Sequence, residues 1–361
     1  MKLNAEKLKL KFILLSFFLS QFYLWSSGLP QFSHILIILC ILFFLFKSIR
    51  ISVNEISILG VFIIYVIFVN SIWFFWLGDW SFVVSTIYWI FNFFTLLMLI
   101  NINNKNIFFN KIILLIPISY LISILIWAVG LGRYNFEPRY NGYFNDPNQM
   151  AFWVLTSCAI YIYIADSFYK KILIYLLAGF LISLTMSRSS TLGFLILTLG
   201  FILKSKGSIP RKIIYSFVSF SLLILLFFIF YSLGYFESVL SRFFEGVNNK
   251  DEQVSSRGFE NLLNYPEYLI FGAGQGAYDL YSETGNEIHS TWLGIFFYYG
   301  IIGIVLFCGF IYSIFSKLKI ADKIIFAGPL FYGFFTYNAR TLIFWFLIAI
   351  FLLYSKDREQ T

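Results

Sequence analysis

Three short polar segments in an otherwise apolar chain hold the residues that could do chemistry. The first spans residues 139–149, where Gly142 favours a turn and Pro147 starts a helix with Asn148 in its first turn. Free N–H groups at a helix N-terminus favour an anion, and Arg139 would complete a cradle for it. The alternative is a capped helix start with interfacial tyrosines. The arginine together with two nearby tyrosines favours a surface that binds glycan or phosphate.

The second segment is the tight turn Ser187-Arg188-Ser189 between two apolar runs. So short a turn holds the charge of Arg188 near membrane depth, where it costs roughly 2.5 to 3.5 kcal/mol on insertion scales. Snorkelling of Arg188 to the interface is one explanation for such a position. A contact with a ligand is the favoured one.

The third segment contains His289, one of two histidines in the chain, at the start of an apolar run and beside Glu287. A lone histidine is usually structural, but this position and its pKa range favour a general base for a sugar hydroxyl. Glu287 and Glu252 are alternative bases. A glycine run at residues 272–276 lacks the strand-to-helix setting of a nucleotide loop. It indicates flexible backbone near a ligand. His34, the other histidine, is expected at the membrane interface.

The sequence around these segments indicates a membrane protein. Of 361 residues, 60% are hydrophobic, 22% aromatic and 12% charged. A water-soluble domain of this size with that composition would expose large apolar surfaces to water. A bilayer core about 30 Å thick takes roughly 20 apolar residues in a helix. The predicted spans are residues 12–28, 31–46, 56–77, 81–101, 112–132, 148–165, 172–187, 190–203, 213–234, 288–315, 324–337 and 341–355. The predicted class is an all-α polytopic integral membrane protein with about 12 transmembrane helices.

A single transmembrane domain is expected to occupy residues 1–361, with a large exoplasmic loop at 235–287 between the ninth and tenth spans. Long loops with aromatic and apolar residues of their own are more often functional than disordered. The three cysteines lie inside apolar spans, and no Asp-x-Asp cluster occurs outside. Neither a metal nor a cofactor is therefore expected, and the lipid bilayer, not nucleic acid, is the expected surrounding.

Lysine and arginine are distributed differently. With both termini cytoplasmic, 19 of the 26 basic residues fall in cytoplasmic segments, as the positive-inside rule predicts. By type, 16 of 17 lysines are cytoplasmic, whereas six of nine arginines are exoplasmic. The planar guanidinium matches phosphate bidentately, which lysine does not. The six arginines therefore indicate a site for a phosphate-bearing ligand, and pairing with exoplasmic carboxylates is the alternative. They are Arg133, Arg139, Arg188, Arg242, Arg257 and Arg340.

Taken in order, these motifs resemble the bacterial O-antigen polymerase and O-antigen ligase superfamily. The resemblance covers mainly residues 139–303: the spacing from Arg139 through Gly142 to Pro147 and Asn148, the 187–189 turn, an arginine in the large loop, and the run from residue 289 to 303. Ser290 departs from the asparagine that commonly follows the histidine. The resemblance implies a glycosyltransferase of the inner (cytoplasmic) membrane that takes glycan from undecaprenyl pyrophosphate at the periplasmic face.

The implied reaction is a metal-independent displacement with inversion at the anomeric carbon. Arg188 and Arg257 would neutralise charge on the departing pyrophosphate, and His289 would accept the proton of the acceptor hydroxyl. Arg139 and Asn148 would position the donor from the segment that Gly142 and Pro147 shape. Outer contacts are assigned to Arg133, Arg242 and Arg340. The implied partners are the undecaprenyl-pyrophosphate-linked oligosaccharide and a chain-length regulator of the polysaccharide assembly system.

A polymerase that joins repeat units is favoured over a ligase that moves finished chains to lipid A core, because the chain is compact and rich in Phe, Ile and Asn. A transporter of lipid-linked glycan is the alternative of another class, and a scaffold is a third. Ion-coupled carriers usually bury ionisable residues at the bilayer midplane. The central portions of the predicted spans contain none.

Overall fold

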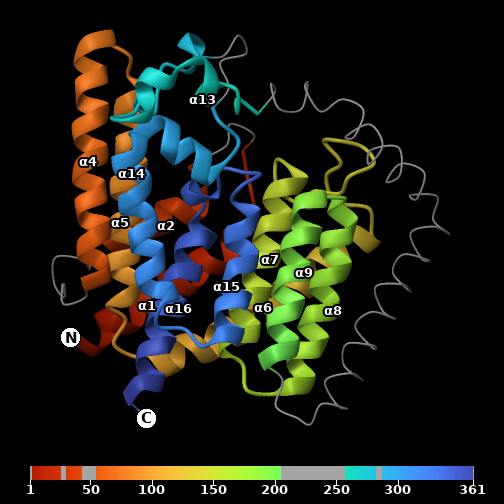
Figure 1. Cartoon of the computed structure of the whole chain (residues 1–361). Coiled ribbons are helices and arrows are strands. Elements are labelled where there is room, and N and C mark those ends of the chain that lie inside the picture. Colours follow the sequence, from red (N-terminus) through yellow and green to blue (C-terminus); the bar gives the residue numbers. More distant parts are fainter. Residues whose placement is uncertain (1, 26–29, 43–53, 205–256, 282–286, 361) are drawn as a thin grey trace.

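The computed structural model describes residues 2–25, 30–42, 54–204, 257–281 and 287–360, and these residues form a helical bundle (Figure 1). The described part of the chain contains no strand, only two isolated bridges near residue 139. The α-helices are α1 (Lys2–Leu19), α2 (Phe32–Cys40), α4 (Asn54–Leu77), α5 (Ser81–Ile100), α6 (Lys105–Ala128), α7 (Pro147–Ile164), α8 (Phe168–Thr185), α9 (Arg188–Lys204), α13 (Asn261–Asn264), α14 (Thr291–Phe315), α15 (Ile320–Tyr332) and α16 (Leu342–Gln360). Short 3₁₀ turns are η2 (Pro266–Leu269), η3 (Tyr278–Leu280) and η4 (Asn338–Arg340).

Helices α7 and α16 form the centre of the bundle. Residues 150–164 of α7 and 342–353 of α16 are buried without interruption. A helix that is apolar on every side is expected to be enclosed by other helices. Accordingly α7 contacts α6, α8, α9, α15 and α16, and α16 also packs against α5. The stacked rings of Tyr163 and Phe351, whose centroids are 3.9 Å apart, join the two central helices.

Close contact between α9 and α15 depends on glycine. A Cβ atom on Gly200 would lie 2.7 Å from the backbone nitrogen of Ile325, and one on Gly193 would lie 3.0 Å from the carbonyl oxygen of Gly328. Small residues at a helix interface let the two backbones approach. The ion pair between Lys204 and Asp322, 2.6 Å long, holds the two helices together near one end.

Helix α14 is broken inside its length at Gly300, which has φ +62° and ψ −167°. The break takes the carbonyls of Phe297 and Tyr298 out of the regular helical pattern. The N–H groups of Ala273 and Gly274 donate to these two carbonyls, at 3.0 and 2.8 Å. The 272–276 segment is thereby attached along α14.

Within the described residues, five helices are long and apolar enough to cross a membrane: α4 over Ile56–Leu77, α5, α6, α8 and α14. The predicted all-helical class is confirmed, and these helices agree with a polytopic membrane protein. The predicted span 213–234 lies outside the described residues, as does most of the predicted loop 235–287. The helix expected at 12–28 instead covers Lys2–Leu19. Helix α2 begins inside the predicted span 31–46, and the last residues of that span lie outside the described part of the chain. The number of spans stays a prediction.

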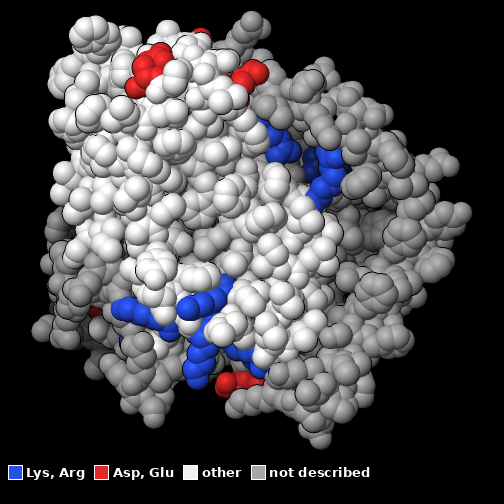
Figure 2. Space-filling model, in the orientation of Figure 1, with Lys and Arg blue, Asp and Glu red and all other residues white. Residues whose placement is uncertain are grey.

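Basic residues separate by type between the two ends of the bundle. The arginines with described side chains, at positions 133, 139, 188, 257 and 340, lie where α8, α15 and η4 end and where α7, α9 and α16 begin. We call this end of the bundle the arginine end. The described lysines lie toward the opposite ends of their helices, called the lysine end. Figure 2 shows basic side chains in two separate groups on the visible face.

Replacing Gly200 by alanine is expected to destabilise the protein, because the new Cβ meets backbone atoms of α15. Overpacking of this kind typically costs about 1 to 3 kcal/mol. Gly60→Ala is the matched control, since its Cβ would come no closer than 3.9 Å to Phe93, and alanine favours a helix. The measurement is the midpoint of thermal unfolding in detergent. Equal midpoints for the two variants would contradict the proposed role of Gly200.

Candidate active site

A cavity of about 740 Å³ opens at the arginine end, where α5, the start of α7, the 275–278 segment and η4 meet. Ligand sites of proteins usually have volumes of roughly 300 to 1,000 Å³. Of the residues predicted from sequence, Asn148, His289, Arg340 and the alternative base Glu287 line the cavity. The complete lining is Tyr23, Ser81, Val84, Ser85, Tyr88, Trp89, Asn92, Asp146, Asn148, Gln149, Gln275, Tyr278, Glu287, His289, Thr336, Tyr337, Asn338, Ala339, Arg340 and Thr341.

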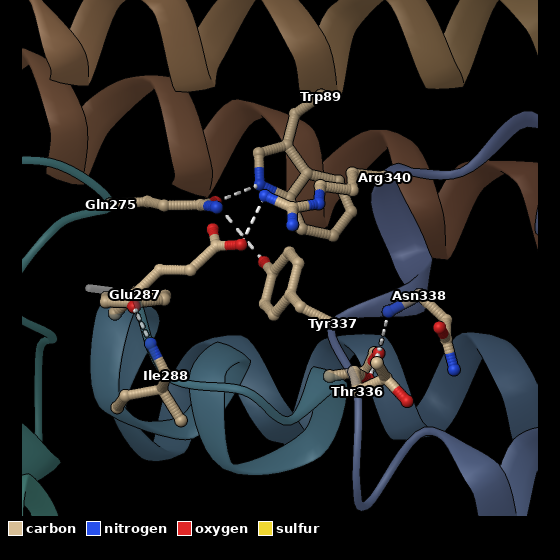
Figure 3. A network of polar contacts seen from close by, with 10 residues as sticks. Trp89, Gln275, Glu287, Ile288, Thr336, Tyr337, Asn338 and Arg340 are labelled. Carbon is tan, nitrogen blue, oxygen red and sulfur yellow. Dashed lines mark hydrogen bonds and ion pairs between the residues drawn. The ribbon is translucent and has the colours of Figure 1, made fainter. Parts of the chain in front are cut away.

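Glu287 and Arg340 both line the cavity and form an ion pair with each other (Figure 3). Glu287 precedes α14 and Arg340 belongs to η4, so the pair joins segments that are distant in sequence. The Arg340 side chain keeps 42% of its surface exposed, because it faces the cavity. Burial lowers the pKa of Arg340, but the charge of Glu287 and nearby tyrosines outweighs this effect and the pKa is raised. For Arg340, the alternative of pairing with a carboxylate is therefore confirmed.

His289 is close to this ion pair and to Arg257. Its backbone N–H donates to the Arg257 carbonyl at 3.1 Å, and its side chain lines the cavity. Burial lowers the pKa of His289 below 6.5; Glu287 opposes the shift, whereas Arg340 and Arg257 add to it. The imidazole is therefore neutral at pH 7 and able to accept a proton.

Ser290 caps helix α14. Its Oγ accepts from the Leu293 N–H at 3.2 Å and donates to the Gly333 carbonyl at 3.3 Å. A serine at this position satisfies a free N–H group of the first helical turn. The residue that departs from the superfamily pattern thus has a structural role next to His289.

Arg188 and Arg257 lie near each other although 69 positions separate them in the sequence. Burial lowers the pKa of Arg257, and the positive charge of Arg188 lowers it further. Arg188 is exposed at the start of α9, and the Arg257 guanidinium lies 6.0 Å from the ring centroid of Phe335. Two neighbouring positive charges repel each other, and an anion bound between them would relieve the repulsion.

Arg139 has a structural role. Its Nε donates to the Thr185 carbonyl at 3.0 Å and its Nη2 to Asn148 Oδ1 at 2.8 Å, with the residue 8% exposed. It therefore ties the 139–146 segment to the end of α8 and does not line the cavity. Asn148 does, and its carbonyl accepts from Tyr332 Oη at 3.0 Å.

The other predicted residues of this region also have structural contacts. Gly142 adopts φ +57° and pairs with Arg133, whose N–H donates to the Gly142 carbonyl at 2.9 Å. Pro147 occupies the first turn of α7, where its missing N–H is not needed. The Arg133 side chain donates to Asn145 Oδ1 at 3.3 Å and does not line the cavity. Arg242 lies outside the described residues.

Apart from Asn148, sequence reasoning missed the uncharged polar groups of the cavity. Gln275 Oε1 accepts from Trp89 Nε1 at 2.9 Å and from Tyr337 Oη at 3.3 Å (Figure 3). It also accepts from Tyr299 Oη at 3.0 Å. Its backbone N–H donates to Asn70 Oδ1 at 2.9 Å. The surrounding glycines permit close packing: a Cβ on Gly274 would lie 2.8 Å from Trp73 and Phe82. The run expected to be flexible is thus packed against α4, α5 and α14.

These features define a helical membrane protein with clustered arginines and a candidate base beside a cavity. The family model described as O-antigen ligase matches residues 173–308, which include Arg188, Arg257 and His289. The match confirms the resemblance to the O-antigen ligase and polymerase superfamily and covers less than half of the chain. No curated protein matches the chain.

Arg139→Lys is expected to lower the unfolding midpoint. A lysine cannot reach both the Thr185 carbonyl and the Asn148 side chain in the same geometry, and a buried acceptor left without a donor costs about 1 to 3 kcal/mol. Arg133→Lys is the control, because that side chain is more exposed and donates over a longer distance. Thermal unfolding of the purified variants checks the prediction. A stable Arg139→Lys protein would contradict the structural role.

Proposed function

We propose that this protein is the polymerase of a bacterial surface polysaccharide. It joins oligosaccharide repeat units carried on undecaprenyl pyrophosphate, as an inverting glycosyltransferase. The observation that carries the proposal is the position of His289 on the cavity wall, in contact with Arg257, whose charge in turn lies near Arg188. A proton acceptor and a phosphate-binding pair are the two groups that this reaction requires.

In the proposed reaction, the acceptor hydroxyl oxygen attacks the anomeric carbon of the donor glycan. The new glycosidic bond forms as the bond from that carbon to the pyrophosphate oxygen breaks. His289 takes the hydroxyl proton, and the electron pair leaves with the pyrophosphate of the carrier lipid. Arg188 and Arg257 stabilise the negative charge that develops there. Glu287 and Arg340, which form an ion pair, act on the pKa of His289 in opposite directions: Glu287 raises it and Arg340 lowers it.

In this proposal the arginine end faces the periplasm, and the lysine end faces the cytoplasm together with both chain termini. The predicted distribution of 19 of the 26 basic residues on the cytoplasmic side supports this orientation, because cytoplasmic segments are enriched in lysine and arginine together. The protein is then a multi-pass protein of the inner membrane, and its undecaprenyl substrate lies in the surrounding bilayer. A donor that is already activated suits a compartment without ATP.

The second candidate function is that of an O-antigen ligase, which transfers finished glycan to lipid A core. The printed description of the matching family favours it. The two functions share the donor, the leaving group and the need for a base, and they differ in the acceptor.

Complementation of a strain in which the gene is deleted tests the function. Wild type is expected to restore a ladder of surface glycan, whereas Arg257→Ala, Arg188→Ala and His289→Ala are expected to leave a single repeat on core. Loss of such charge stabilisation typically lowers turnover about 10²- to 10³-fold. Lys170→Ala, at an exposed position of the lysine end, is the control at matched membrane expression.

Normal ladders from all three variants would reject the site. Loss of all long glycan from core, with polymer accumulating on the carrier lipid, would identify the ligase instead.

Transfer activity is expected to fall as the pH is lowered, with the midpoint of this acid limb below pH 6.5. The reason is that the His289 pKa is lowered and the imidazole must be neutral to act as a base. Glu287 raises that pKa, so Glu287→Gln is expected to lower it further and to move the acid limb to lower pH. Asp279→Asn, which removes an exposed carboxylate elsewhere in the loop, is the control. Transfer rates of purified enzyme across pH 4.5 to 8 give the comparison. A shift of the limb toward higher pH in Glu287→Gln would exclude His289 as the base.

A further inference from the structure

The 266–277 segment lies alongside helices that are long enough to cross a membrane. It consists of η2, the exposed residues Ile270 and Phe271, and the glycine run, and it packs against α14. Figure 1 shows it near the end of α4. The sequence predicts an exoplasmic loop at 235–287, which would place this segment in water. Its contacts with α4 show how deep it lies.

Two side chains of α4 donate to backbone carbonyls of the segment. Tyr65 Oη donates to the Phe271 carbonyl at 2.8 Å, and Trp73 Nε1 donates to the Gly272 carbonyl at 3.0 Å. At 1.5 Å per residue, Tyr65 and Trp73 lie about 18 and about 6 Å before the end of the helix. The apolar stretch of α4 ends at Leu77, and half of a bilayer's hydrocarbon core is about 15 Å thick. The 271–272 backbone therefore lies at the level of the hydrocarbon.

The backbone of the segment is satisfied as lipid requires. Irregular backbone at membrane depth is found only where it is buried in protein or borders a water-filled cavity. Residues 272–277 are all buried, and Gln275 lines the cavity. The four successive N–H groups of residues 272–275 donate to acceptors within the protein at 2.8 to 3.0 Å. A loop in water would not need these partners, because water would supply them.

The side chains at the bend of the segment are apolar and exposed. Ile270 is 58% exposed and Phe271 is 64% exposed. The Ile270 carbonyl packs against the break in α14, next to the exposed Ile301. On α4, the exposed Phe68 has its ring beside that of Tyr65, which bonds to Phe271. The exposed surface of the bend is therefore continuous with the apolar faces of two helices that are able to cross a membrane.

The chain reaches the bend from the arginine end and returns to it. Before the bend the chain passes Arg257, and after it the Ala277 N–H donates to Ser81 Oγ, in the first turn of α5, at 2.9 Å. Glu267 and Asp279, on either side of the bend, are exposed. They mark the limits of the part that hydrocarbon could surround, because a charge there is costly.

We propose that residues 268–274 form a re-entrant element that enters the arginine-end half of the bilayer, with Ile270 and Phe271 in contact with lipid acyl chains. The acyl chains are the occupant of this apolar surface. This position depends on the membrane-crossing helices and is independent of the proposed reaction. It also places the Gln275 side of the cavity within the membrane, so that a ligand in the cavity is bound at membrane depth.

Spin labels on single cysteines test the depth of the bend. The full chain is used in lipid nanodiscs with Cys308→Ser, which removes the exposed native cysteine, while Cys40 and Cys158 are buried. Phe271→Cys and Asp279→Cys each receive a nitroxide label in this background. Electron paramagnetic resonance then measures collisions with oxygen, which concentrates in hydrocarbon, and with a water-soluble nickel chelate. The label at 271 is expected to lose collisions with nickel and to keep those with oxygen, whereas the label at 279 is expected to be reached by nickel.

Phe68→Cys, at an exposed position of α4, is the matched control and gives the values for a lipid-facing label. Nickel accessibility at 271 equal to that at 279 would place the bend in water and overturn the proposal. Weak collisions with both reagents at 271 would show that protein covers the bend, from the same chain or a second copy, and would overturn it as well. Ile270→Cys decides the outcome if Phe271→Cys fails to give a folded protein by size exclusion. None of these measurements uses glycan transfer, so their failure leaves the proposed function standing.

Discussion

Helix ends and helix breaks expose backbone carbonyls and N–H groups, and in a protein surrounded by lipid these groups must be satisfied from within. At the arginine end this constraint determines the local structure. The break at Gly300 is met by the 272–276 segment, the end of α8 by Arg139, and the start of α7 by Asp146, whose Oδ1 accepts from the Asn148 N–H at 2.6 Å. Each of these contacts also positions a segment beside the cavity. The candidate site is thus assembled from the polar connections that close the helix ends.

Arginines that look equivalent in sequence have different roles in the fold. Arg139 is almost fully buried and bonded to a backbone carbonyl, and Arg340 is paired with Glu287. Arg188 and Arg257 instead combine proximity with like charge. An anionic ligand gains most from the last arrangement, because it would relieve the repulsion between the two positive charges. The role of each arginine depends on the groups that surround its guanidinium, and these groups cannot be deduced from the amino-acid composition.

The amino-acid sequence predicts the class and most helix positions because long apolar runs need only local information. It also brings out His289 as a candidate, since Glu287 lies beside it, whereas His34 has no charged residue nearby in the sequence. It does not reveal the amide side chains from other segments that join the cavity lining: Asn92 lies in α5, Gln275 in a glycine run and Asn338 in η4, and only the packing brings them to one cavity. A single asparagine inside the apolar α5 was the available signal. His34, expected at the interface, is buried, and its Nδ1 accepts from the Gln31 N–H at 3.2 Å.

Gln275 joins α5, α14 and the segment before η4 through a single oxygen atom that accepts from three donors. The three donors come from different parts of the chain, so the position of Gln275 in the cavity lining depends on how all three pack. A substitution that shifts any one of these elements is therefore expected to move a residue of the cavity. What the cavity binds can in this way change through positions that do not line it.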